Sequence, residues 1–233
     1  MLSATAYALP LLAAVSPWLW AARVGVIVVG LGLWHWTQQL IARRAPVTPA
    51  GGGVIADGIH QLTAGWHRRL QADPRRADAL LLVSSLVIDL LGLGLITSAV
   101  LGPTFRPFLG LIMLFGLRQF CQALCPLPPP PGMIWRSPGF PSLLVTYGVN
   151  NDLFFSGHTA IAVFGAATLA TAYGPLGLAL GAALVVFEIV AVLALRAHYT
   201  LDVFAGAVTA LWVYSLTGKI APVADTWLAG LIG

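Results

Sequence analysis

The amino-acid sequence predicts an all-α integral membrane protein, a bundle of six transmembrane helices with one amphipathic helix at the membrane surface. Charged residues form only 9% of the 233-residue chain and hydrophobic residues 58%, and the mean hydropathy is +0.88. A soluble domain of this length could not cover its surface with so few charges. Crossing the hydrocarbon layer as a helix takes ~20 mostly apolar residues, and the chain contains several such runs.

Prolines, glycines and arginines divide the apolar sequence into separate candidate spans. The expected spans are residues 18–36, 79–101, 105–124, 153–173, 176–195 and 201–216. We expect one transmembrane domain, with a lead-in and first span in residues 1–42, an interfacial segment in 43–79 and a five-span core in 80–233. The N-terminus lacks a basic start and its apolar run is long, so no cleavable signal peptide is expected.

The segment between the first two spans has an apolar stripe at helical spacing. After a glycine hinge at 51–53, apolar residues recur at Ile55, Ile59, Leu62, Trp66 and Leu70. This spacing predicts one amphipathic helix over 54–70, lying in the head-group layer. His60 and His67 are polar positions and are expected on its solvated face, with contact to lipid head groups as the alternative.

A run of consecutive prolines, residues 128–131, interrupts the segment 126–151. Prolines fix φ and remove backbone donors, so we expect a long, stiff loop outside the membrane. With six spans, the segments 43–79, 125–152 and 196–200 all lie on one side of the membrane. The residues that carry chemistry are therefore expected at that same face.

At this face, histidines stand where loops meet the fourth and sixth spans. His198 and Asp202 are four residues apart, so on a helix the carboxylate lies on the same face as the imidazole. Asp202 can accept from one ring nitrogen and leave the other free to attack, while His158 can protonate a leaving oxygen. The small residues Ser156 and Gly157 allow close backbone approach, and a helix N-terminus favours an anion.

A nucleophile, an orienting carboxylate and an acid are the groups that displacement at phosphorus requires. No metal motif is visible, because Cys121 and Cys125 lack a second cysteine pair. We therefore expect neither a metal nor another cofactor. A single histidine at a membrane interface is more often structural, but two on one face, one of them paired with an acid inside a span, favour catalysis.

Both histidine segments resemble the signature motifs of sphingomyelin synthases, a family within the type 2 phosphatidic acid phosphatase superfamily. The matching segments are Ser156-Gly157-His158-Thr159 and His198-Tyr199-Thr200-Leu201-Asp202-Val203. Asp152 matches the aspartate of the family's first motif, Arg118 its preceding arginine motif and residues 127–138 its proline-rich loop. The resemblance covers residues 118–207, the C-terminal half of the chain.

The resemblance implies a six-span enzyme in which His198 is the nucleophile, Asp202 its partner and His158 the acid, later the base. The expected reaction moves a phospho-head-group from a phospholipid onto His198 and releases diacylglycerol. A lipid alcohol such as ceramide or diacylglycerol then accepts the group, or water does, giving phosphotransferase or phospholipase C-type activity. Residues expected to bind substrate are Asp152, Ser156, Gly157, Arg118, Arg136, Arg196 and Tyr199.

The superfamily's phosphatases also carry a lysine and an arginine that hold a phosphate dianion, and this chain departs from them. Ala99 and Ala191 stand at those positions, and the Arg106-Pro107 pair lies on the opposite face from the histidines. We therefore expect phosphodiester lipids to be preferred over monoesters. The alternatives are a lipid phosphate monoester phosphatase and a non-catalytic lipid-binding or transport protein.

Eleven arginines and one lysine give the chain a formal net charge of +4. They cluster beside the spans, where anionic head groups lie, so the expected partners are membrane lipids and the phospholipid and lipid-alcohol substrates, not nucleic acid. Gly177 and Gly181 form a Gly-x-x-x-Gly pair compatible with a homo-oligomer. Asp89 and Glu188 lie mid-span and should face the bundle interior, either supporting the site or in plain packing.

Two signals conflict over which side of the membrane carries the site. Eight arginines lie on the site face against Arg106 and Lys219 on the other, which by the positive-inside rule predicts a cytoplasmic site. The resemblance instead implies the exoplasmic face of a bacterial-type cell membrane. We expect the exoplasmic or periplasmic face, with some of the arginines binding lipid phosphates.

Overall fold

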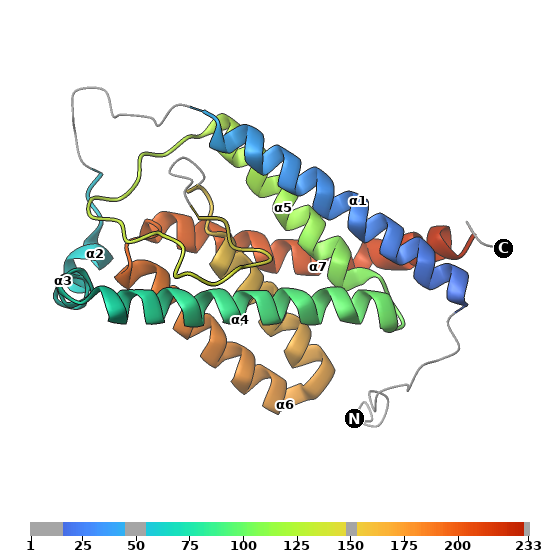
Figure 1. The fold of residues 1–233 in the computed structure, drawn as a ribbon. Coiled ribbons are helices and arrows are strands. Elements are labelled where there is room, and N and C mark those ends of the chain that lie inside the picture. Colours follow the sequence, from blue (N-terminus) through green and yellow to red (C-terminus); the bar gives the residue numbers. More distant parts are fainter. Residues whose placement is uncertain (1–15, 45–54, 148–152, 231–233) are drawn as a thin grey trace.

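The computed structural model describes residues 16–44, 55–147 and 153–230, and all regular structure within these ranges is α-helical. The helices are α1 (Pro17–Ala42), α2 (Gly58–Leu62), α3 (Ala64–Ala72), α4 (Pro74–Leu101), α5 (Arg106–Leu124), α6 (Gly157–Ala194) and α7 (Thr200–Gly230). Five of these described helices, α1, α4, α5, α6 and α7, are long and apolar enough to cross a membrane. They form a bundle with α2 and α3 together at one end (Figure 1). The chain is therefore a multi-pass membrane protein.

Prolines and a carboxylate mark where the long helices begin. Pro17, Pro74 and Pro107 occupy first-turn positions of α1, α4 and α5, where a missing N–H costs no helical hydrogen bond. The Asp73 carboxylate accepts from the backbone N–H of Arg76 at 3.3 Å and so caps α4. Helix α4 thus begins before the core boundary expected at residue 80, and α7 continues past its expected end at residue 216.

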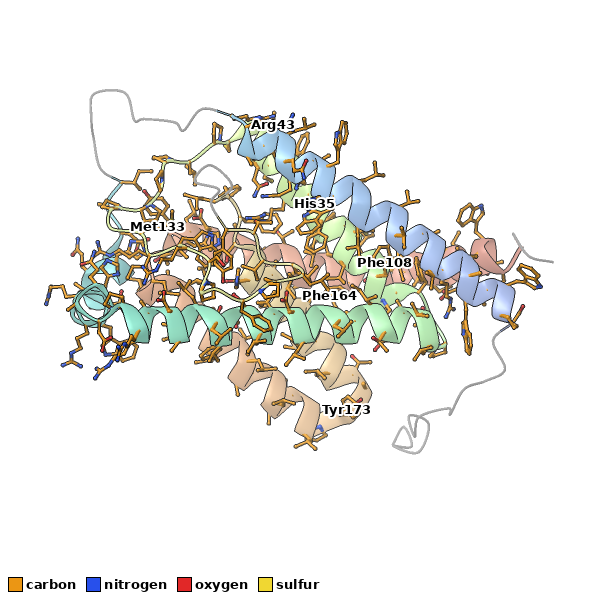
Figure 2. All side chains as sticks on the ribbon, viewed as in Figure 1. His35, Arg43, Phe108, Met133, Phe164 and Tyr173 are labelled. Carbon is orange, nitrogen blue, oxygen red and sulfur yellow. The ribbon has the colours of Figure 1, made fainter. Side chains whose placement is uncertain are left out.

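Helix α6 folds back on itself (Figure 1). Gly174 has the non-helical dihedral angles φ 60° and ψ −135°, at the turn that the sequence predicts, and Figure 2 places Tyr173 at this bend. The two arms pack closely, since a Cβ on Gly181 would come within 2.7 Å of Ala166. Gly177 and Gly181 therefore serve contacts inside the chain, and a homo-oligomer stays a prediction. Counting the arms separately would give six spans, and that number stays a prediction.

The segment predicted as one amphipathic helix forms two short helices with a break at Thr63. Two of its polar residues are buried, with His60 6% and His67 1% exposed, while Arg68 and Arg69 are exposed. The prediction that these histidines face solvent is wrong, because each ring donates to a backbone carbonyl that needs a partner in the bundle. The outward side carries Leu62, 81% exposed, and Trp66, 55% exposed. Its location in the head-group layer stays a prediction.

The proline-rich segment 125–147 contains neither helix nor strand and runs into the bundle beside α4 (Figure 1). Asp89 of α4 holds its inner end. The carboxylate accepts from the Ser142 hydroxyl at 2.8 Å and from the backbone N–H groups of Leu143 and Leu144 at 2.9 Å. Of the two roles expected for Asp89, hydrogen-bonded support of a loop is the one observed.

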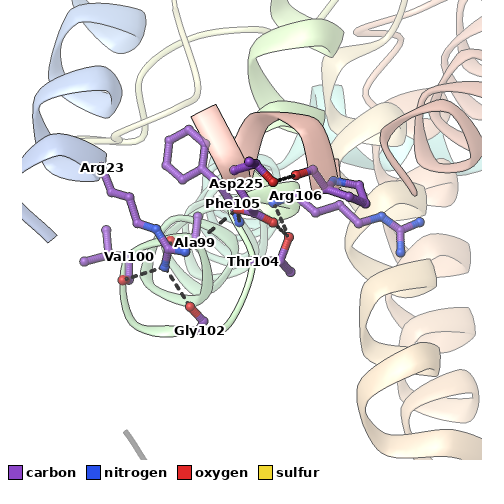
Figure 3. Close-up of polar contacts among 10 residues, drawn as sticks. Arg23, Ala99, Val100, Gly102, Thr104, Phe105, Arg106 and Asp225 are labelled. Carbon is purple, nitrogen blue, oxygen red and sulfur yellow. Dashed lines mark hydrogen bonds and ion pairs between the residues drawn. The ribbon is translucent and has the colours of Figure 1, made fainter. Parts of the chain in front are cut away.

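The opposite end of the bundle is joined by a polar cluster (Figure 3). Arg23 of α1 is 3% exposed. Its guanidinium donates to carbonyls at the end of α4, those of Ala99, Val100 and Gly102. Asp225 of α7 accepts from the Thr104 hydroxyl at 2.6 Å and the Phe105 N–H at 2.7 Å, and lies 3.8 Å from Arg23. These contacts connect α1, α4, α5 and α7.

Candidate active site

A cavity opens where α5 ends and α6 and α7 begin. Its lining includes residues that the sequence singles out: His158, His198, Gly157 and Arg118. The rest of the wall is mostly apolar and consists of Trp34, Ile88, Phe115, Trp135, Leu144, Val145, Thr146, Leu153, Ile161 and Ala197. A few convergent polar groups in an apolar wall are the usual form of a small-ligand site.

The N-termini of α6 and α7 are joined by a main-chain contact. Ser156 caps α6, since its hydroxyl accepts from the Thr159 N–H at 3.3 Å. Its own N–H donates to the Asp202 carbonyl at 3.0 Å. Gly206 permits this approach, because a Cβ there would lie 2.6 Å from the Ser156 carbonyl oxygen. Ser156 thus brings His158 next to α7, but it does not line the cavity.

His158, in the first turn of α6, is buried against Trp135. The two rings meet edge to face with their centroids 5.3 Å apart. The Trp135 indole N–H donates to the Thr146 carbonyl at 3.0 Å, and its ring contacts Tyr147, so the 125–147 segment forms one wall around His158. In the described part of the chain, His158 Nε2 has no hydrogen-bond partner.

His198 lies just before α7, and Asp202 is in its first turn. His198 Nδ1 and Asp202 Oδ2 are 3.6 Å apart, and the carboxyl is fully buried. This separation exceeds a hydrogen bond, so the bond predicted from the four-residue spacing is not made. Oδ2 accepts instead from the Tyr199 N–H at 2.9 Å. Among the residues described, His198 Nδ1 and Asp202 Oδ1 have no hydrogen-bond partner.

Arg118, near the end of α5, brings a positive charge to the cavity. Its Nε donates to the Phe155 carbonyl at 2.9 Å, which connects α5 to the residues before α6. The guanidinium lies against Gly157, where a Cβ would be 3.2 Å from Nε. Gly157 therefore lets Arg118 and the N-terminus of α6 face the cavity together, an arrangement suited to one anionic group.

Two histidines of the surface segment hold the main chain between α6 and α7. His60 Nε2 donates to the His198 carbonyl, and His67 Nδ1 donates to the Ala194 carbonyl, both at 2.9 Å. Sequence reasoning missed this role. The signal was their seven-residue separation, which places two donors on one side of a helical segment, although nothing in the sequence names the carbonyls they meet.

Asp57 connects the surface segment to α7. Its carboxylate caps α2 and also accepts from the N–H and the hydroxyl of Thr200, at 2.6 and 2.7 Å. Burial by itself raises the pKa of Asp57, but hydrogen bonds from Thr200 and from the His60 N–H outweigh it and leave the pKa below its ordinary value. Sequence reasoning missed Asp57 as well; an aspartate before Gly58 is a recognisable N-cap.

The proline-rich segment contacts the same connection from its other side. The Ile134 N–H donates to the Leu195 carbonyl at 2.9 Å, and the Arg196 side chain to the Pro131 carbonyl at 2.8 Å. Gly132 has a φ of 76°, and a Cβ there would lie within 3.1 Å of side chains of α3. Arg196, predicted to bind substrate, therefore anchors a loop and lies outside the cavity lining.

The other residues predicted to bind substrate lie elsewhere. Arg136 pairs with Asp78 at 2.7 Å and lines a separate surface pocket. The Tyr199 ring stacks on His60, with centroids 5.8 Å apart, and is not part of the cavity lining. Asp152 lies outside the described residues.

The site offers an imidazole at the start of each of two helices, a carboxylate behind one and a guanidinium beside the other. These groups can supply a nucleophile, an acid or base, and an anion contact. Among the residues described, no group of three or more His, Cys, Asp or Glu side chains is placed to hold a metal ion. A site without cofactors stays a prediction.

The sequence model of the family described as AtPDCT1/2 matches residues 57–219, more than half of the chain. The chain belongs to this family. AtPDCT1/2 is a sphingomyelin synthase-like family named for phosphatidylcholine:diacylglycerol cholinephosphotransferase, so the resemblance to sphingomyelin synthases is confirmed only at the level of that wider lineage. The family is one of phospholipid head-group transferases. No curated protein and no solved structure matches the chain.

Proposed function

We propose that this AtPDCT1/2-family protein is a lipid phosphotransferase, which moves a phospho-head-group from a phospholipid to a lipid alcohol through a phosphohistidine at His198. The observation that carries the proposal is the pair of buried imidazoles, His158 and His198, that line one cavity, with Asp202 beside the second. The family match supports the reaction class.

In the first half-reaction, Nε2 of His198 attacks phosphorus, because Nδ1 is the ring nitrogen nearest Asp202. The P–N bond forms as the ester P–O bond breaks, and the departing diacylglycerol oxygen takes a proton from His158. The buried Asp202 carboxylate stabilises the positive charge that the phosphorylated ring acquires.

In the second half-reaction, the hydroxyl oxygen of the acceptor attacks the phosphohistidine. The now neutral His158 takes the hydroxyl proton, the P–N bond breaks, and the imidazole of His198 is restored. Water in place of the lipid alcohol would give hydrolysis. The mostly apolar cavity wall favours the lipid acceptor, since it limits the access of water.

The charge and aromatic content of the cavity support a phosphocholine donor. A phosphodiester carries one negative charge, which matches the single guanidinium of Arg118 on the lining. Trp34, Phe115 and Trp135 also line the cavity, and aromatic rings attract quaternary ammonium groups through cation–π contacts. Phosphatidylcholine is accordingly the preferred donor. The family's name favours diacylglycerol as the acceptor, with ceramide as the alternative.

The test is transfer by the purified protein from head-group-labelled phosphatidylcholine, phosphatidylethanolamine and phosphatidylglycerol, with and without ceramide or a diacylglycerol whose acyl chains differ from those of the donor. We expect label to enter the acceptor, and rapid quenching to trap it on His198. His35→Ala is the matched control, because His35 lies exposed on α1 and off the cavity lining. No transfer from any donor would contradict the proposal, and transfer without a phosphohistidine would replace the two-step route with direct displacement.

In the membrane, we assign the two arms of α6 to separate crossings and the site to the exoplasmic face. Separate crossings put the starts of α6 and α7 on one side, in agreement with the Ser156–Asp202 main-chain contact. In a Ser137→Cys variant with Cys121 and Cys125 changed to Ser, an impermeant maleimide should label from the exoplasmic side. Labelling only from the cytoplasm would reverse the orientation.

A further inference from the structure

The catalytic residue of the proposed function lies on main chain that no helix supports. His198 follows the end of α6 and precedes Thr200, where α7 begins. Its imidazole is turned so that Nδ1 stands 3.6 Å from Asp202, just beyond hydrogen-bonding range. A small movement of the backbone here would change the direction from which the ring meets a substrate, and misplacement by ~1 Å can cost about 100-fold in rate.

The His60 ring contacts this stretch directly. Its Nε2 lies 2.9 Å from the His198 carbonyl oxygen, in a buried position, and its ring stacks on the next residue, Tyr199. A carbonyl can only accept, so Nε2 must carry a proton. The His67 contact at Ala194 and the Asp57 contacts at Thr200 hold the two ends of the same connection. Of these three contacts, the one made by His60 reaches the backbone of the reactive residue.

We infer that His60 is a positioning residue for the transfer reaction: its N–H fixes the His198 main chain so that the imidazole faces the cavity. This inference rests on the proposed function of His198. It assigns His60 no contact with substrate, because His60 is not on the cavity lining. The effect of His60 is therefore expected in the rate of the chemical step and not in lipid binding.

Two substitutions separate positioning from packing. His60→Phe keeps an aromatic ring against Tyr199 but removes the donor. His60→Gln removes the ring but retains an N–H near the position of Nε2. A packing role predicts that Phe is tolerated and Gln is not, and a positioning role predicts the reverse. His35→Phe gives the same chemical change at an exposed histidine of α1.

The experiment measures kcat, KM and the rate of phosphohistidine formation for these variants, with thermal unfolding in detergent. We expect His60→Phe to lower kcat by roughly 10- to 100-fold with little change in KM, and His60→Gln to recover most of the loss. His35→Phe should match the wild type. Full activity in His60→Phe, or equal losses in Phe and Gln, would overturn the inference.

A second readout keeps this test separate from the proposed function. The imidazole ¹⁵N resonances of His198, assigned through their absence in His198→Ala, should move in His60→Phe and stay in place in His60→Gln. If the wild-type protein transfers no head group, the proposed function fails alone, because these resonances still report on positioning. Unmoved resonances in an active enzyme would refute positioning and leave the transfer reaction standing.

Discussion

The two ends of the bundle treat their buried polar groups differently. At the end shown in Figure 3, both oxygens of Asp225 accept hydrogen bonds, and Arg23 donates to several carbonyls. At the other end, within the residues described, Asp202 Oδ1, His198 Nδ1 and His158 Nε2 have no hydrogen-bond partner. An unpaired buried polar atom costs about 1–3 kcal/mol, so these three atoms lower the stability of the site end.

The difference in unpaired buried atoms indicates which end of the bundle is suited to binding a ligand. At the first end, Trp20 Nε1 and the Nε atoms of Arg23 and Arg106 also have no partner in the described structure, but other nitrogens of the two guanidiniums are bonded. At the site end, the unpaired atoms of the described residues include the ones that would react or orient a reacting ring, together with His67 Nε2 and Arg196 Nε. Buried polar atoms of this kind call for an explanation, and the reaction proposed above would supply one.

The largest effect should come from a matched pair of substitutions at the two ends. His198→Ala removes the nucleophile and should lower kcat/KM by about 10⁴-fold or more, with little loss of stability because its Nδ1 has no partner to lose among the described residues. Asp225→Asn should retain turnover but cost about 1–3 kcal/mol, since it disturbs filled hydrogen bonds. Transfer assays measure the activity of the two variants, and thermal unfolding in detergent measures their stability. Equal loss of activity in the two variants would contradict the proposed difference between the two ends.

The next largest effect tests His158 as the general acid. His158→Ala should slow transfer from phosphatidylcholine by ~10²–10⁴-fold, because the diacylglycerol alkoxide then leaves without a proton. With nitrophenyl phosphocholine most of that loss should vanish from the first half-reaction, measured as the burst of nitrophenolate, since nitrophenolate is a stable leaving group. His198→Ala should stay inactive on both substrates. Recovery of His198→Ala by the activated ester, or no recovery of His158→Ala, would mean that the two roles are exchanged or absent.

A further effect concerns substrate charge. A phosphomonoester carries nearly two negative charges and a diester one, and a dianion near hydrocarbon calls for several fixed cations. Ala191 is buried, and Ala99 belongs to the opposite end, where its carbonyl binds Arg23. Diacylglycerol release from phosphatidylcholine should therefore exceed phosphate release from phosphatidic acid in catalytic efficiency. A ten-fold preference for phosphatidic acid would favour the phosphatase alternative.

Sequence patterns predicted the features that depend on local chemistry. Apolar run lengths predicted the long helices, Gly174 the bend in α6, and motif positions the two histidines that meet at one cavity. The inward direction of Glu188 was also predicted, and it accepts from the Ser84 hydroxyl at 2.7 Å. Each of these follows from composition or from spacing along one helix.

The patterns failed where a buried polar group finds its partner far away in the sequence. Leu62 points outward, as expected for a helix at the membrane surface, but His60 and His67 turn in toward the carbonyls of His198 and Ala194. Long-range pairs were also out of reach, since no local signal joins Arg136 to Asp78 or Asp57 to Thr200.

The smallest expected effect concerns Asp57, a carboxylate at the site end that we expect to stabilise the fold through hydrogen bonds, as Asp225 does. Asp57, unlike Asp202, has both oxygens occupied, by Thr200 and by N–H groups of α2. Asp57→Asn can still cap α2, but its amide places a donor near the donors of Thr200. We expect a cost of about 1–2 kcal/mol with most of the turnover retained. Asp73→Asn is the matched control, a cap of α4 with one N–H bond and an exposed ion pair, and should cost less than about 0.5 kcal/mol.

The stability that the Asp57 carboxylate contributes should depend on pH. The pKa of Asp57 is lowered below its ordinary value of 3.8 in the folded chain, so its carboxylate stabilises the fold above that value. This contribution disappears as the pH falls through the lower, folded pKa. The difference in unfolding midpoint between wild type and Asp57→Asn should therefore be largest near neutral pH and shrink as the pH falls below 3.8. A difference that stays constant over this range would show that the loss comes from altered packing around Thr200. Asp57 would then not stabilise the fold through its charged carboxylate, the role that we assign to Asp225.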